Sequence, residues 1–246
     1  MKVGNKDFWE NENIIKTQDI SKNISNFEAF MFEKAKERYK AFGKIKNIKV
    51  FGCGTGREIK SIVEIYHPSR IVASDISENM ISKCKKNLEI WKMNSITETI
   101  VGNALDFNKV SCQFELVTVL NSMLTYVPER NNRLGILKNA HQILKDDGVM
   151  IGTVHNQVGT LTKTLYFKIR NFFSVFLGEN VGNRDTGFNG LYIPGYYYAK
   201  KGLLEDIEES GFKNIEVYSL EEFSILNGTS YNRKKGYNNL IFIASK

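Results

Sequence analysis

The most informative segment of the sequence is Lys49-Val50-Phe51-Gly52-Cys53-Gly54-Thr55-Gly56-Arg57-Glu58-Ile59. An apolar run leads into three alternating glycines, and apolar residues then recur at helical spacing, at Ile59, Ile62, Val63 and Tyr66. This pattern predicts a strand over about 47–52, a tight turn, and a helix over about 57–66. Glycine permits a sharp turn and removes the Cβ atoms that would keep a ligand from the backbone. The start of the helix offers free N–H groups and the positive end of a dipole.

The spacing of the glycines separates several kinds of nucleotide site. A dinucleotide fingerprint, G-x-G-x-x-G, would need a glycine where Arg57 stands, and the G-K-[ST] of a P-loop is absent. The spacing G-x-G-x-G resembles motif I of the class I S-adenosylmethionine-dependent methyltransferases. The resemblance implies that the turn binds the methionine part of this cofactor through Gly52, Cys53, Gly54 and Gly56. Val50 departs from the family, which usually has an acidic residue at this position.

A carboxylate follows the second predicted strand. This strand covers residues 70–74 and ends at Asp75, and Ser77 is expected to cap a helix that extends to Trp91. A carboxylate at this point can accept hydrogen bonds from both hydroxyls of a nucleoside ribose. We therefore predict that Asp75 and its neighbour Ile76 contact the cofactor. The alternative is that Asp75 only caps the following helix.

The resemblance continues after a third predicted strand, over about 97–101, at Gly102-Asn103-Ala104. The family often has Gly-Asp-Ala here, and its acid pairs with the adenine amino group. The resemblance implies that Asn103 accepts from this amine through its amide oxygen. It also implies that Ala104 donates its backbone N–H to a ring nitrogen. A simple polar turn is the alternative.

The alternation of predicted strands and helices indicates the fold class. Continuous apolar runs at 114–120 and 149–154 are typical of parallel strands covered on both faces, and a helix is expected between them after Pro128. A helix over 200–210 precedes two further strands, at 212–218 and 239–244. We predict a doubly wound α/β fold with a mostly parallel seven-stranded sheet that ends, as in the family, in an antiparallel strand pair.

We expect one methyltransferase domain over residues 1–246. Residues 1–45 would form an N-terminal helical cap, 46–155 the cofactor-binding core, 156–199 a lid-like insertion, and 200–246 the C-terminal helix and strand pair. The cap contains a helical stripe from Asn26 and two aromatic anchors, Phe8 and Trp9; it would cover the sheet or close over the ligands. The insertion has an apolar stripe that includes Phe172 and Phe173. A lid is the favoured interpretation, and a dimer surface, a membrane-surface helix and core packing are alternatives.

The composition narrows the class of protein. A chain of 246 residues with 42% hydrophobic and 25% charged residues is ordinary for a globular domain. No apolar run approaches the about 18 residues of a membrane span, and the N-terminus lacks the apolar core of a signal peptide. Cys53, Cys84 and Cys112 have neither metal-site nor disulfide spacing, so we expect no metal and a cytoplasmic location. The net charge of +7 comes from scattered lysines and also permits an anionic partner.

Catalytic candidates follow from the chemistry that the resemblance implies. The protein mainly aligns the nucleophile and excludes water, and a base matters only if the acceptor must lose a proton. Ligands of such sheets bind at the carboxyl ends of the strands, where Asn121, Tyr126 and His155 follow the fourth and fifth strands. Asn121 is expected to contact the cofactor as well. Core packing of Tyr126 and a structural role for His155 are the alternatives.

The absence of two motifs from the sequence excludes two classes of DNA methyltransferase. The segment Asn121-Ser122-Met123-Leu124 lacks the Asp/Asn-Pro-Pro-Tyr/Phe of DNA amino-methyltransferases, and the Pro-Cys pair of cytosine C5 enzymes is absent. We predict a monomeric or homodimeric enzyme that methylates a nitrogen or oxygen of a small molecule, which the positive charge allows to be anionic. An RNA methyltransferase, favoured only by the charge, and a non-catalytic cofactor-binding protein, favoured only by Val50, are the alternatives.

Overall fold

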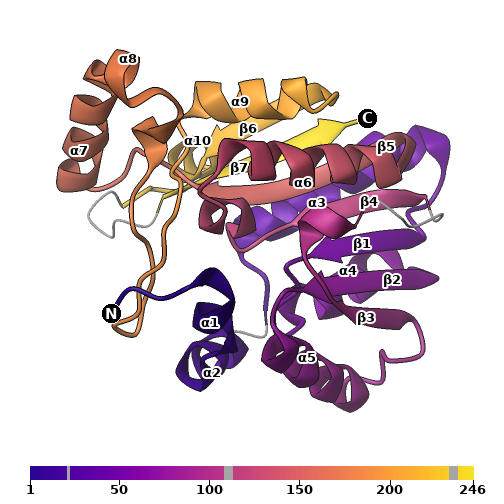
Figure 1. The fold of residues 1–246 in the computed structure, drawn as a ribbon. Helices are drawn as coiled ribbons and strands as arrows, with labels where there is room; N and C mark the ends of the chain where they lie inside the picture. The colour runs from indigo at the N-terminus through magenta and orange to yellow at the C-terminus, as the bar shows by residue number, and fades with distance from the viewer. Residues whose placement is uncertain (21–22, 108–112, 233–237) are drawn as a thin grey trace.

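A single twisted sheet organises the protein. The computed structural model describes residues 1–20, 23–107, 113–232 and 238–246, so Cys112 lies outside the described residues. The strands lie in the order β3-β2-β1-β4-β5-β7-β6 (Figure 1). Their bounds are β1 (Asn47–Phe51), β2 (Arg70–Asp75), β3 (Thr97–Val101), β4 (Phe114–Val119), β5 (Leu144–His155), β6 (Lys213–Ser219) and β7 (Asn239–Ser245).

The pairing of the strands matches the predicted fold class. β1 lies parallel to β2 and β4, with Val50 opposite Ala73 on one side and Thr118 on the other. β3 and β5 extend the parallel arrangement outward, and β7 runs antiparallel to both β5 and β6. The predicted doubly wound sheet with a C-terminal antiparallel pair is therefore confirmed.

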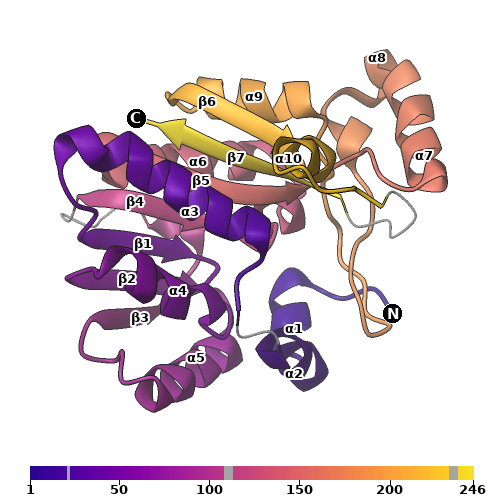
Figure 2. The same ribbon diagram turned by 180° about the vertical axis from the view of Figure 1, so that it is seen from behind.

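Helices cover both faces of the sheet, as Figures 1 and 2 show from opposite sides. On one face lie α3 (Asn26–Tyr39), α4 (Arg57–Tyr66), α5 (Glu78–Ile90) and α10 (Leu220–Leu226). On the other lie α6 (Arg130–Ile143) and α9 (Lys200–Glu209). Short 3-10 turns occur at η1 (Lys40–Phe42), η2 (Ala104–Asp106), η3 (Met123–Tyr126) and η4 (Gly178–Gly182).

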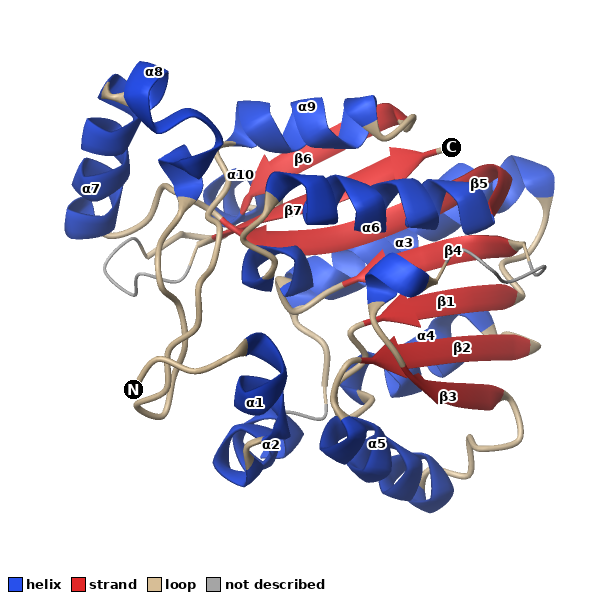
Figure 3. Ribbon diagram, viewed as in Figure 1, coloured by secondary structure: helices blue, strands red, loops and turns tan. Residues whose placement is uncertain are grey.

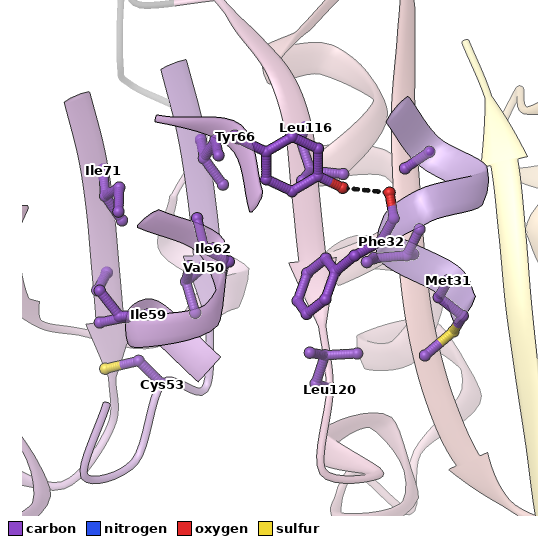
Figure 4. Close-up of a cluster of buried hydrophobic side chains, with 14 of the residues drawn as sticks. Met31, Phe32, Val50, Cys53, Ile59, Ile62, Tyr66, Ile71, Leu116 and Leu120 are labelled. Atoms are coloured by element: carbon purple, nitrogen blue, oxygen red, sulfur yellow. Dashed lines mark hydrogen bonds between the residues drawn. The ribbon is translucent and has the colours of Figure 1, made fainter. Parts of the chain in front are cut away.

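The core beneath α3 and α4 shows why the strand-turn-helix segment folds as it does. Ile59 and Ile62 of α4 are fully buried against β1 and β4, and Phe32 of α3 packs beside them (Figure 4). The Tyr66 hydroxyl donates a hydrogen bond of 2.6 Å to the backbone oxygen of Phe32. This bond satisfies a polar atom inside the apolar layer and joins α4 to α3.

The N-terminal segment and the insertion meet at one end of the sheet. The segment contains α1 (Asn5–Glu10) and α2 (Glu12–Ile20), and the insertion contains α7 (Leu161–Phe172), α8 (Ser174–Leu177) and a hairpin over 183–196. The backbone N–H of Tyr192 donates to Met1, and that of Val3 donates to Tyr192. Figure 1 shows the chain start beside the hairpin tip. Segments far apart in the sequence thus form one structure.

Two boundaries and one additional helix differ from the sequence expectations. α6 begins at Arg130 because Glu129 has extended backbone dihedrals. β5 starts directly after α6 and pairs Leu144 with Phe114, so it is longer than 149–154. α10 had no predicted counterpart; it is fixed by a capping box between Ser219 and Glu222. Within the described part of the chain, the helices are all too short or too polar to cross a bilayer.

Candidate active site

A cavity opens at the carboxyl ends of the parallel strands, where loops gather in Figure 3. Its empty space, including the part open to solvent, is about 760 Å³. The lining comes from the N-terminal helices, from the end of β2 and the loops after β1 to β4, and from one residue each of α5 and α6. The residues are Asn5, Trp9, Gln18, Gly52, Gly54, Ser74, Asp75, Ile76, Met80, Gly102, Asn103, Ala104, Asn121, Met123, Tyr126, Val127 and Ile136.

The glycine turn forms the floor of this cavity with an exposed backbone. Gly52 and Gly54 have φ values of 64° and 53°, in the left-handed region that other residues rarely adopt. A Cβ on Gly54 would meet no atom within 4 Å, so the space beside it is open to a ligand. A Cβ on Gly52 would lie 2.9 Å from Cγ of Met123. The turn therefore needs glycine both for its dihedrals and for close approach.

Asp75 joins the glycine turn to the end of β2. Its Oδ2 accepts from the backbone N–H of Gly54 at 2.8 Å, and its Oδ1 accepts from that of Ser77 at 3.0 Å. Burial raises the pKa of this carboxyl, and the backbone donors oppose that rise. Each carboxylate oxygen has a further lone pair, so the group can accept hydroxyl donors while it holds the turn.

The segment after β3 forms the next wall. The Asn103 amide oxygen accepts from the backbone N–H of Leu105 at 3.1 Å, which starts η2. The Asn139 amide donates to the backbone oxygens of Ala104, at 2.9 Å, and Leu105, at 2.7 Å. Asn139 of α6 therefore fixes the turn that carries the predicted adenine contacts, although nothing in the sequence marked it.

A buried lysine lies behind this wall. The Lys49 ammonium donates to the Ser74 hydroxyl at 2.6 Å and lies 3.7 Å from the centroid of the Phe107 ring. Lys49 is completely buried on the central strand β1, and this burial lowers its pKa to about 7. Because Ser74 lines the cavity, its hydroxyl connects the titratable amine of Lys49 to the cavity wall.

A charged network adjoins the cavity through Asn121. Arg57 pairs with the buried carboxylate of Glu28 at 2.5 Å and donates to the Asn121 amide oxygen at 2.8 Å. Burial raises the pKa of Glu28, but the Arg57 guanidinium and the Ser25 donors outweigh it and hold the pKa below its usual value. The network joins the starts of α3 and α4 to the end of β4.

The backbone after β4 is strained at this network. Asn121 and Ser122 both have positive φ values, 52° and 56°. The Thr153 hydroxyl of β5 accepts from the backbone N–H of Ser122 at 2.8 Å and holds this conformation. Asparagine tolerates such dihedrals, whereas they are costly for serine, and costly backbone conformations concentrate at functional sites. Here they direct Asn121 into the cavity.

Glu58, beside the glycine turn, is completely buried. Neither of its carboxylate oxygens has a hydrogen-bond partner among the described residues. Desolvation raises its pKa to about 7, although Arg57 opposes the rise. A neutral carboxyl in this place avoids much of the energy of a buried unpaired charge.

The cavity is roofed by the N-terminal segment and the hairpin. Phe8, Tyr126 and Ile193 form a buried apolar cluster with Trp9 and Phe188 packed against it. The Trp9 and Tyr126 rings meet edge to face with centroids 5.0 Å apart, and the Asn5 amide donates to the backbone oxygen of Tyr126 at 2.7 Å. The N-terminal segment thus covers the ligand space, whereas α3 covers the sheet.

The predicted site residues separate into two groups. Most of them line the cavity: Gly52, Gly54, Asp75, Ile76, Asn103, Ala104, Asn121 and Tyr126. Cys53, Gly56 and His155 do not belong to its lining. The Cys53 side chain belongs to the core under α4, and its backbone N–H donates to Ser74. Gly56, with φ 87°, precedes the first residue of α4 and shapes the turn from behind.

His155 lies behind the wall of the cavity. Its ring centroid is 5.9 Å from that of Tyr126 and 5.1 Å from that of Tyr197. Burial, with a smaller effect of Lys163, lowers its pKa to about 4, and its Nδ1 atom has no hydrogen-bond partner in the described structure. A neutral imidazole therefore supports the tyrosine that faces the ligand space.

Several lining residues were not predicted from the sequence. Met80 and Ile136 come from apolar helix stripes whose members are otherwise core, and Met123 and Val127 follow β4. Asn5 and Gln18 lie on the N-terminal helices, and only the aromatic pair Phe8-Trp9 signalled that this segment approaches the site. Spacing alone does not separate them from ordinary packing and surface residues.

Comparison with known proteins agrees with this geometry. A sequence profile described as a methyltransferase domain matches residues 48–148. A carboxy-S-adenosyl-L-methionine synthase from Glaesserella parasuis is 30% identical over 107 residues, which cover 43% of each protein. One from Shewanella pealeana is 26% identical over 166 residues, covering 65% of this chain and 61% of that protein. The matches thus span about two fifths to three fifths of these curated relatives.

Solved structures show the same fold over most of the chain. The N-methyltransferase NodS from Bradyrhizobium japonicum, in complex with S-adenosyl-L-homocysteine, superposes with a TM-score of 0.59 at 12% identity, covering 98% of this chain and 96% of that one. A methyltransferase from Clostridium acetobutylicum gives 0.59 at 14% identity, covering 88% and 89%. These solved structures show the fold predicted from the sequence. Residues 48–148 therefore match the methyltransferase-domain family, in agreement with the family predicted from the sequence.

Proposed function

We propose that the protein transfers the methyl group of S-adenosylmethionine to a nitrogen or oxygen of a small molecule. One observation carries this proposal: a single cavity brings together the open glycine turn, the Asp75 carboxylate, the Asn103-Ala104 turn and Asn121. These groups come from four different strand ends and match the chemistry of a nucleoside linked to an amino acid.

The residues that we assign to the cofactor fit its parts. The open backbone at Gly54 would accommodate the methionine part, and the Asp75 carboxylate would accept from the ribose hydroxyls. Asn103 and Ala104 would recognise the adenine edge. Val50, where the family usually has an acid, is fully buried in the core, so other groups must orient the methionine end. The Arg57–Glu28–Asn121 network lies at this end and is our candidate.

When bound, S-adenosylmethionine supplies an electrophilic methyl group on a sulfonium. The chain's own residues would then position the acceptor and exclude water. Asn121 and Tyr126 face the ligand space, and Trp9 with Asn5 closes it from the N-terminal side. We propose that the 183–196 hairpin stabilises this roof, so that the insertion acts as a lid through its hairpin.

The charges of the side chains that line the cavity indicate which group is transferred and which acceptors fit. Asp75 is the charged side chain among the described lining residues, and no lysine or arginine of the described chain lines the cavity. The curated relatives are named carboxy-S-adenosyl-L-methionine synthases, whose product carries an additional carboxylate. A cavity without a lining cation among the described residues favours transfer of the methyl group, which creates no new anion, over formation of that carboxylate. The same lining favours an uncharged or cationic acceptor.

Calorimetry tests the cofactor assignment. We expect S-adenosylmethionine and S-adenosylhomocysteine to bind, and NAD to bind at least tenfold more weakly, because Arg57 occupies the third glycine position of a dinucleotide turn. Tighter binding of NAD would contradict the proposal. Incubation with methyl-labelled cofactor and separate small-molecule and RNA fractions then distinguishes the acceptors. Label in RNA would support the RNA alternative, and transfer to any acceptor would exclude a non-catalytic protein.

A second test concerns His155. Because it lies behind Tyr126, we propose that it positions this tyrosine, and we expect His155→Ala to reduce kcat by less than about tenfold with an unchanged pH profile. The sequence-based prediction of a catalytic base gives a different outcome on a hydroxyl acceptor. It requires a decrease of roughly 10²–10⁴-fold and loss of the acidic limb of the pH profile. Tyr126→Phe serves as the comparison variant.

A further inference from the structure

Helix α7 turns its apolar face away from the protein. Leu161, Leu165, Ile169 and Phe172 are 90%, 59%, 52% and 82% exposed, whereas Phe167 on the opposite side is buried. The exposed residues recur at the spacing of one helical stripe. An ordinary surface helix directs such a stripe into the core, so this orientation requires another explanation.

The short helix α8 extends the same surface. Val175 and Phe176 are 90% and 86% exposed, and Phe173 is about half exposed. Figures 1 and 2 show α7 and α8 standing out from the body of the protein, at the end of the sheet where the parallel strands finish. Monomeric soluble proteins rarely expose a contiguous apolar surface of this kind without a binding role. We call the exposed apolar residues of α7 and α8 the α7–α8 face.

The charges around the α7–α8 face have one sign. Residues 161–177 contain Lys163, Lys168 and Arg170 and no acidic residue; Lys168 is exposed, whereas the Lys163 ammonium turns inward, 5.8 Å from the Tyr197 ring centroid. The Arg170 guanidinium donates to the backbone oxygen of Val181 at 2.9 Å, which holds it beside the helix. The nearest following acid, Glu179, lies 3.9 Å from Arg130. The face thus combines apolar side chains with a net positive border.

The combination of apolar and basic side chains favours an anionic surface over a second copy of the chain as the partner. A second copy of the chain would bring Lys168 and Arg170 of one copy toward the same residues of the other, and such like-charge contact is unfavourable. An anionic surface would complement the border and take up the apolar side chains at the same time. Helices with Lys and Arg on one side and Phe and Leu on the other typically lie in the interface of a bilayer.

We propose that the α7–α8 face docks on an anionic lipid bilayer, with the apolar side chains in the interface and the basic residues near the headgroups. The Lys and Arg side chains have long apolar stems that allow their charges to remain at the headgroup level. Attraction to anionic lipid adds to the burial of the apolar side chains and weakens at higher ionic strength.

Vesicle flotation tests this proposal independently of methyl transfer. The protein is mixed with vesicles of phosphatidylcholine alone, or of equal parts of phosphatidylcholine and phosphatidylglycerol. We expect it to float with the anionic vesicles at low salt and to bind the neutral vesicles at least tenfold more weakly. The triple variant Leu165→Gln, Phe172→Gln, Phe176→Gln should lose at least tenfold in binding to anionic vesicles, and Lys168→Glu should weaken it in the same direction.

Matched controls use exposed apolar residues elsewhere. Ile90→Gln on α5 and Leu226→Gln on α10 replace side chains that are 73% and 62% exposed, and both should bind like the wild type. An unchanged Tm shows that each variant is folded. Equal binding by the triple variant, or no flotation with anionic vesicles, overturns the proposal. A dimer in sedimentation that the triple variant converts to monomer also overturns it and assigns the face to a second copy.

Discussion

Replacing Asp75 by alanine is expected to weaken the binding of S-adenosylmethionine by 100-fold or more. In our assignment the carboxylate accepts from two ribose hydroxyls, and hydrogen bonds to a charged group contribute roughly 1.5–3 kcal/mol each. Their combined loss, about 3 kcal/mol or more, corresponds to at least two decades in the dissociation constant. The carboxylate also holds the backbone N–H of Gly54, so the floor of the cavity would loosen as well.

A second variant separates these two effects. Asp75→Asn keeps an acceptor for one of the two backbone donors, Gly54 or Ser77, and removes the charge. We expect cofactor affinity to fall at least about tenfold because the charge is lost. The protein should stay folded because one neutral acceptor remains for a backbone donor. Glu78→Gln, which changes an exposed acid three residues further on, is the matched control and should bind normally. Calorimetry gives the affinities and thermal unfolding reports the fold. An unchanged dissociation constant in Asp75→Asn would place the ribose elsewhere.

The fold could be predicted because its signals are local. The glycine turn, the apolar strand runs and the Ser77 cap each depend on residues close in sequence, and the structure has β1, α4, β2 and α5 within about two residues of the expected bounds. The meeting of Gly54 and Asp75 also followed, since both stand at carboxyl ends of neighbouring parallel strands.

The remaining features depend on contacts between distant segments. Arg57 meets Glu28 and Asn121, which come from α3 and the loop after β4, and no spacing in the sequence signals such a pairing. The roof joins Phe8 to Ile193, which are about three quarters of the chain apart. The insertion is an example. Its periodicity predicted an apolar stripe, but the direction in which that stripe faces depends on how α7 packs against the rest of the protein.

The second large effect concerns the stability of the protein as a function of pH. Lys49 and Glu58 are both fully buried, and burial brings each pKa to about 7, from above and from below respectively. For Lys49 the folded pKa is depressed from 10.5, so the unfolded state binds more protons between pH 7 and 10.5. The stability contribution of Lys49 therefore rises with pH through this range and is lost as the pH falls through 7.

For Glu58 the sign is opposite. Its folded pKa is raised from 4.5, so its contribution is fully present below pH 4.5 and is lost as the pH rises through 7. His155, whose folded pKa is depressed from 6.5, acts against Glu58 between about pH 4 and 6.5. The wild-type curve combines these effects, so single variants are needed to separate them.

We expect Lys49→Met to change the free energy of unfolding relative to the wild type by an amount that depends on pH. The advantage of the variant should be largest near pH 6, where the wild type buries a charged ammonium. It should shrink by roughly 3 kcal/mol toward pH 9, as the wild-type amine becomes neutral in the folded state. Denaturant unfolding at a series of pH values, without cofactor, measures the difference.

Glu58→Gln is the matched comparison, because it removes a buried titratable group on the other side of the same strand-turn-helix segment. Its stability relative to the wild type should increase, by roughly 2–3 kcal/mol, from pH 5 to 8, as the wild-type carboxyl ionises without a partner. The two variants should thus show opposite trends, which a general effect of pH on unfolding cannot produce. A pH-independent difference for Lys49→Met would mean that the lysine keeps its charge throughout the range. The Ser74 hydroxyl and the Phe107 ring would then hold an ammonium, rather than an amine, behind the cavity wall formed by Asn103 and Ala104.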